Sequence, residues 1–194
     1  MHHRQKLAGG WTDATLTDLG RQQAHMTADF LKAKAPFPPA ALLSSDLRRA
    51  VETASVIGAE LGLVVETTPA LRELSNGVAA GRPIEEITRL QRPRSEPILD
   101  WVPFPEGESW RMMYQRVASC LSALSAGGRD SLVIVSHANS IVCIINWFLR
   151  LETDDALRDL MYEIRPCSIT QLRRGDDGTR VVVRLNDTEH LARL

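Results

Sequence analysis

The chain has little of several features that mark large classes of protein. Its three cysteines show no paired spacing, which favours reduced core residues over disulfides or cysteine-based metal sites. Its longest apolar run, residues 141–149, is interrupted by Asn146 and is far shorter than the ~20 residues of a membrane helix. The formal net charge is −1, so no whole-protein field attracts nucleic acid or anionic lipid. We therefore expect no membrane association and no nucleic-acid partner.

What is present is typical of one globular domain. The chain has 194 residues, of which 44% are hydrophobic and 24% charged, enough for a substantial core. No charged-then-apolar leader is visible at the start, so a cytoplasmic protein is expected. We predict a single domain over residues 1–194. Nothing in the composition predicts an oligomeric state.

Apolar spacing predicts alternating helices and strands, with Thr17 as a candidate N-cap. This alternation favours an α/β fold with a mostly parallel central sheet flanked by helices on both faces. Residues 75–105 are interrupted by prolines yet keep apolar residues, which predicts an irregular cap within the domain. Helices are predicted over residues 16–34, from 46, over 84–91, over 108–125 and from about 140; strands over 41–44, 64–67 and 132–135; and a hairpin from 168–173 and 180–185.

His137 stands where a strand and a helix meet. In parallel sheets, ligands bind beyond the C-terminal ends of the strands, and His137 follows the buried strand 132–135. The small residues Ala138 and Asn139 then lead into a helix, whose first N–H groups favour an anion. The alternative is that His137 caps the helix or is bonded in the core.

Two further residues are candidates for phosphate chemistry. Arg49 lies at the start of a helix beside a strand end, where a guanidinium can hold a phosphoryl group through two hydrogen bonds. Glu73 lies in a turn-rich segment, where burial would raise its pKa and let it protonate a leaving oxygen. Taken alone, neither residue stands out, because a solvated surface charge is the commoner role of such an arginine and Glu73 is one of many glutamates. The adjacent His2 and His3 cannot both face one ion, so no metal or other cofactor is expected.

In combination, these segments resemble the histidine phosphatase superfamily, the phosphoglycerate mutase-like proteins, over almost the whole chain. The resemblance implies a histidine nucleophile, a phosphate-binding arginine at Arg49 and a proton donor at Glu73. It further implies phosphate contacts from His137 and from the N–H groups of Ala138 and Asn139, a small phosphorylated metabolite as substrate, and no metal. The segments that carry it are GWTD at 10–13, LTDLG at 16–20, SSDLRRA at 44–50, LRE at 71–73, PEGES at 105–109, VIVSH at 133–137 and LNDTEHL at 185–191.

One family motif is missing. The family's nucleophile stands in an Arg-His-Gly tripeptide at the end of the first central strand, and this tripeptide does not occur in the sequence. The register places it a few residues before Met1, so the first central strand is expected to be missing through N-terminal truncation. Three hypotheses follow: a phosphomonoester hydrolase with a phosphohistidine intermediate, inactive as written; a pseudoenzyme that binds phosphate ligands; and a phosphoglycerate mutase.

Overall fold

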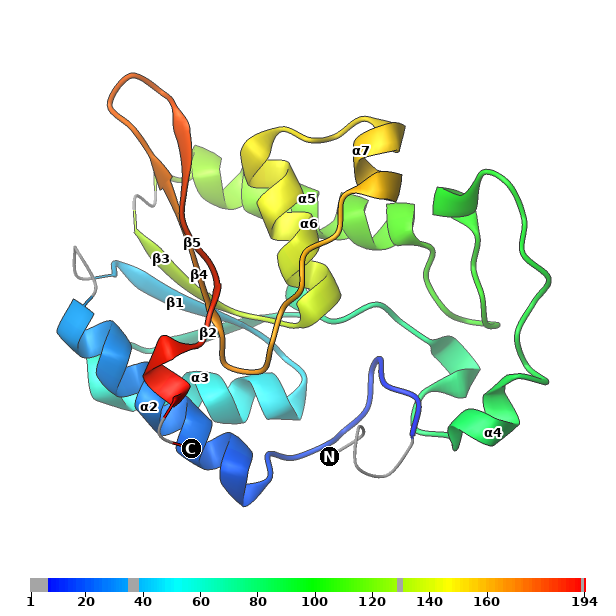
Figure 1. Cartoon of the computed structure of the whole chain (residues 1–194), viewed down its shortest axis with the longest axis horizontal. Coiled ribbons are helices and arrows are strands. Elements are labelled where there is room, and N and C mark those ends of the chain that lie inside the picture. Colours follow the sequence, from blue (N-terminus) through cyan, green and yellow to red (C-terminus); the bar gives the residue numbers. More distant parts are fainter. Residues whose placement is uncertain (1–6, 35–38, 129–130, 193) are drawn as a thin grey trace.

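A three-stranded parallel sheet lies at the centre of the computed structural model, which describes residues 7–34, 39–128, 131–192 and 194 (Figure 1). The strands are β1 (Ala41–Ser45), β2 (Val65–Thr68) and β3 (Leu132–Val135), in the order β2-β1-β3. Residue Leu42 pairs with Val65 on one side and with Val133 on the other. All five residues of β1 are buried, as expected of an apolar strand with partners on both edges.

Helices cover both faces of this sheet (Figure 1). Helices α2 (Asp18–Lys34) and α3 (Arg48–Leu61) lie on one face, and α5 (Trp110–Ala126) and α6 (Ala138–Leu149) lie on the other. Successive side chains of a strand point to opposite faces. Leu42 accordingly packs with Ile57 of α3, whereas Leu43 packs with Ile144 of α6. The predicted α/β fold with helices on both faces is confirmed.

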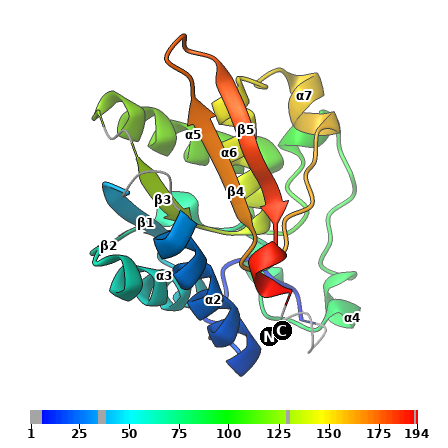
Figure 2. The ribbon, with the colours of Figure 1, turned by 60° about the vertical axis from the view of Figure 1, so that its left-hand side comes forward.

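The C-terminal part forms a separate antiparallel hairpin, as predicted. Its strands are β4 (Ile169–Arg174) and β5 (Arg180–Asp187), and the N–H of Gly175 donates to the carbonyl of Thr179 at 2.7 Å. Figure 2 shows β5 leading into the short 3₁₀ helix η4 (Glu189–Leu191), which packs against α2. Within the described residues, β3 pairs only with β1 and β4 only with β5, so β3 forms an edge with half-buried residues.

Several element boundaries differ from those predicted. Helix α6 begins at Ala138 rather than near residue 140, with His137 as its N-cap residue. Helix α4 (Ile84–Ile87) is a single turn without buried residues, so nothing in the core supports the longer predicted helix. Helix α7 (Asp154–Asp159), capped by the Thr153 side chain, was not predicted. The predicted cap at Thr17 does form, because its Oγ1 accepts the N–H of Gly20 at 3.0 Å.

Residues 75–105 contain only short elements, among them the 3₁₀ helices η2 (Gly77–Ala79) and η3 (Ile98–Asp100). This segment contacts the beginning of the described chain. Near Arg82 it pairs with the beginning of the described chain, where the N–H of Ala8 donates to the Arg82 carbonyl at 2.8 Å. In the part of the chain that the structure describes, no helix is both long enough and apolar enough to cross a membrane.

Candidate functional site

The site lies at the C-terminal ends of β1 and β3. Nε2 of His137 is 2.8 Å from the hydroxyl oxygen of Ser45, the last residue of β1, and His137 is only 9% exposed. Burial lowers the pKa of His137 to about 3, with smaller contributions in the same direction from the positive charges of Arg49 and Arg116. At neutral pH, His137 is therefore an uncharged imidazole whose hydrogen bond to Ser45 joins the two strand ends.

Arg49 lies in the first turn of α3 and reaches the loop at residues 10–12. Its Nη2 donates to the carbonyl of Gly10 at 3.0 Å, and its Nη1 to the carbonyl of Thr12 at 3.2 Å. Burial lowers the pKa of Arg49 and the charge of Glu73 opposes this, but the guanidinium remains protonated at any physiological pH. Within the described residues no carboxylate forms an ion pair with Arg49, so its charge is available to an anion.

Glu73 follows the 3₁₀ helix η1 (Pro69–Leu71) and turns its carboxyl group inward. Its Oε1 accepts the N–H of Leu74 at 2.7 Å, and its Oε2 accepts the N–H of Asn139 at 3.3 Å. Burial raises the pKa of Glu73, while these hydrogen bonds and the charge of Arg49 act in the opposite direction. A carboxyl with a raised pKa can hold a proton closer to neutral pH and deliver it to a leaving group.

The structure thus brings the three predicted side chains together. The charge of Glu73 acts to raise the pKa of Arg49, and the charge of Arg49 acts to lower the pKa values of Glu73 and His137. The N–H of Asn139, which is predicted to bind phosphate, donates to the Glu73 carboxyl group in this structure. Ala138, whose N–H is also predicted to bind phosphate, is the first residue of α6. His2 and His3 lie outside the described residues.

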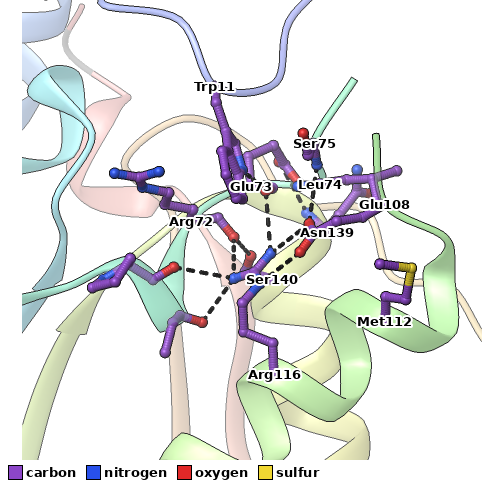
Figure 3. A network of polar contacts seen from close by, with 12 residues as sticks. Trp11, Arg72, Glu73, Leu74, Ser75, Glu108, Met112, Arg116, Asn139 and Ser140 are labelled. Atoms are coloured by element: carbon purple, nitrogen blue, oxygen red, sulfur yellow. Dashed lines mark hydrogen bonds and ion pairs between the residues drawn. The ribbon is translucent and has the colours of Figure 1, made fainter. Parts of the chain in front are cut away.

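The sequence reasoning missed an ion pair behind Glu73 (Figure 3). The side chains of Glu108 and Arg116 form two hydrogen bonds, at 2.9 and 2.8 Å, and Ser109 caps α5 between them in sequence. Arg116 lies beneath the turn that carries Glu73 and donates to several of its carbonyls. Glu108 precedes Ser109, the N-cap residue of α5, so the pair does not lie on one face of a helix, and its eight-residue spacing is not a local signal that could have found it.

Trp11 connects the loop at residues 10–12 to the same turn. Its indole N–H donates to the carbonyl of Glu73 at 2.6 Å, and the guanidinium of Arg72 lies 4.6 Å from its ring centroid. Arg72 in turn forms two 2.7 Å hydrogen bonds with Asp46, which hold the pKa of that carboxyl below its usual value. Segments 44–46 and 71–73, recognised separately in the sequence, are therefore bonded directly to each other.

The chain is similar to known proteins over most of its length. A protein of Yersinia pestis (strain Pestoides F) named "Probable phosphoglycerate mutase GpmB" is 31% identical over 193 residues, covering 94% of this chain and 86% of its own length. A mycobacterial glucosyl-3-phosphoglycerate phosphatase in complex with VO3 superposes with a TM-score of 0.80 at 26% identity, covering 96% of this chain and 94% of the other. A phosphoserine phosphatase from Entamoeba histolytica, in complex with 3-phosphoglyceric acid, gives a TM-score of 0.74 at 26% identity, covering 96% and 91%.

The family assignment rests on nearly the whole chain. The family model described as "Histidine phosphatase superfamily (branch 1)" matches residues 1–188. The structural matches named above share the fold along more than nine tenths of both chains. The chain belongs to the histidine phosphatase superfamily.

Proposed function

We propose that the site binds the phosphoryl group of a small phosphorylated metabolite and that its residues serve phosphomonoester hydrolysis. The observation that carries this proposal is the convergence of Arg49, His137 and a half-buried Glu73 with a raised pKa. Phosphoryl transfer needs positive and hydrogen-bonding groups around the phosphoryl oxygens and a proton for the leaving oxygen. The names of the two solved phosphatases support the same class of substrate.

Each residue has a distinct part in the proposed reaction. Arg49 holds the phosphoryl oxygens through its guanidinium, and neutral His137 offers a hydrogen bond without adding charge. A histidine nucleophile attacks phosphorus, the bond from phosphorus to the ester oxygen breaks, and the Glu73 proton passes to that oxygen. Water then attacks the phosphorus of the phosphohistidine and the phosphorus–nitrogen bond breaks, which releases inorganic phosphate and the free histidine. The water proton passes to the Glu73 carboxylate, which restores the site.

The sequence does not supply a nucleophile through the family's motif, because the sequence contains no Arg-His-Gly tripeptide. His137, the histidine of the site, has its Nε2 at Ser45. We therefore expect the 194-residue chain to bind phosphate and to turn over esters slowly or not at all. The non-catalytic phosphate binder remains the second candidate function, favoured by this missing tripeptide.

Added imidazole can separate these two functions. Calorimetry with inorganic phosphate measures binding, and hydrolysis of phenyl phosphate is followed with and without imidazole as an external nucleophile. A hydrolase site would show turnover that depends on imidazole and on Glu73, with Glu73→Gln as the matched variant. Binding without imidazole-dependent turnover would favour the pseudoenzyme.

Three other results would change the proposal. Absence of phosphate binding would overturn both candidate functions. Fast hydrolysis without imidazole would show that another residue, such as His2 or His3, is the nucleophile. Exchange of phosphate between the positions of phosphoglycerate, dependent on a bisphosphorylated primer, would instead identify a mutase.

A further inference from the structure

The turn that carries Glu73 is held from behind by one side chain of α5. Nη1 of Arg116 donates to the carbonyl of Ala70 at 2.9 Å and to that of Arg72 at 3.2 Å, and its Nη2 lies 3.4 Å from the carbonyl of Glu73 itself (Figure 3). Nη1 is also within 3.3 Å of the Pro69 carbonyl. One guanidinium thus contacts four carbonyls within residues 69–73, the segment that ends at Glu73.

Glu108 holds the other side of the same turn. Its Oε2 accepts the N–H of Ser75 at 3.1 Å, and its own backbone N–H donates to the Ser75 carbonyl at 3.0 Å. The side chains of Arg116 and Glu108 are 19% and 12% exposed, so water competes weakly for their hydrogen bonds. The ion pair consequently fixes the backbone both before and after Glu73.

We propose that Arg116, paired with Glu108, is a positioning residue that holds the turn so that the Glu73 carboxyl stays buried against the N–H groups of Leu74 and Asn139. Arg116 acts through the turn and does not contact the phosphoryl group. This inference rests on the proposed function, because it assigns the pair to the orientation of the proton donor in that function.

The ion pair with Glu108 also explains how Arg116 can lie next to the turn without stabilising the charged form of Glu73. The charge of Arg49 lowers the pKa of Glu73, whereas the charge of Arg116 is balanced by the bonded Glu108. Besides Arg49 on α3, Cys143 on α6 is a titratable group near Glu73. Burial raises the pKa of its thiol, and the charge of Glu73 adds to this increase. A lysine could not replace Arg116, because an ammonium lacks the flat fork that reaches the carboxylate and several carbonyls at once.

The experiment is a carboxyl titration of the full 194-residue protein by carbon-13 NMR, with the Glu73 signal assigned from its loss in Glu73→Gln. The test variants are Arg116→Lys and Arg116→Met, with Glu108→Gln as a milder change. Arg111→Lys is the matched control, because Arg111 lies on the same helix but pairs with the exposed Asp100 and Asp154. Melting temperatures and calorimetry with inorganic phosphate are measured in parallel.

We expect the pKa of Glu73 to fall towards its ordinary carboxyl value in both Arg116 variants, because the loosened turn lets water reach the carboxyl. Glu108→Gln should give a smaller fall, and Arg111→Lys none. If Arg116→Met does not fold, Arg116→Lys and Glu108→Gln still decide the question.

An unchanged Glu73 titration in the folded Arg116 variants, even with a lower melting temperature, would overturn the positioning role and leave only a stabilising one. Phosphate binding is a separate readout. Its absence in the unchanged protein would overturn the proposed function, while the Glu73 titration would still report whether Arg116 positions the carboxyl.

Discussion

Two loops of the site are each held by one arginine, and the two arginines differ in what balances their charge. Arg49 binds the loop at residues 10–12 through neutral carbonyls, whereas Arg116 binds the turn at 69–75 through carbonyls and the carboxylate of Glu108. An arginine already bonded to a carboxylate has fewer N–H donors left for a ligand. The comparison therefore supports the two proposals, namely that Arg49 binds phosphate and that Arg116 positions the turn of Glu73.

The largest expected effect compares Gly77, which follows the turn at 69–75 as the first residue of η2, with Gly10 of the loop at residues 10–12. Gly77 has φ +46°, and a Cβ there would lie 2.0 Å from the carbonyl oxygen of Pro105. Gly77→Ala should therefore lower the free energy of unfolding by about 2–4 kcal/mol, through overpacking and left-handed backbone.

Gly10, with φ +92°, is the matched position in the other loop, where a Cβ would lie 3.0 Å from the N atom of Asn76. Gly10→Ala should cost about 1–2 kcal/mol, since the strain is mostly that of the backbone. Urea denaturation of both variants measures the difference. Equal losses would show that the two loops are equally tightly packed.

Removal of the Arg49 charge, which is proposed to bind phosphate, should have the next largest effect. Arg49→Ala should weaken the binding of inorganic phosphate on the order of 10- to 100-fold, since hydrogen bonds to charged groups contribute about 1.5–3 kcal/mol. Arg48→Ala is the control, because the exposed Arg48 is already paired with Glu52. Calorimetry at one ionic strength decides, and equal weakening by both variants would contradict the assignment.

His137, whose pKa burial and the charges of Arg49 and Arg116 lower, should make stability depend on pH. Because its pKa is about 3 in the folded protein, only the unfolded chain takes up this proton between the ordinary histidine value of 6.5 and that pH. Stability should therefore fall as the pH decreases through this window. In His137→Asn the fall from pH 6 to pH 4 should be smaller, as measured by denaturation at several pH values. The same slope in both proteins would show that His137 is not the group responsible.

Glu73 should contribute with the opposite sign and a smaller size. Its pKa is raised in the folded protein, so its contribution to stability is greatest at low pH and declines as the pH rises through the folded pKa. Glu73→Gln, which cannot ionise, should gain stability relative to the unchanged protein between pH 4 and pH 7. Thermal unfolding at these two pH values tests this, and a relative loss at pH 7 would show that the carboxylate is the favoured form.

Local sequence patterns were sufficient for most of the fold. The four-residue apolar run at 132–135 and the run at 41–44 predicted β3 and β1, because buried parallel strands are apolar on both faces. Helix α7 was missed because a helix of six residues shows too little periodicity. The length predicted for α4 was wrong because its turn has no buried face to extend.

By itself, the sequence determined the α/β layering and the candidate residues Arg49, Glu73 and His137. Apolar periodicity and short motifs are local properties, and the residues they mark stay at the ends of the same strands and helices. Only the tertiary structure determined which of Arg49 and Arg116 forms an ion pair with a carboxylate. Arg49 and Arg116 look alike in the sequence, and both bind carbonyls of a distant loop in the folded protein. They differ because Arg116 also bonds to the carboxylate of Glu108. Burial, which neutralises His137 and raises the pKa of Glu73, likewise depends on every element packed around the site.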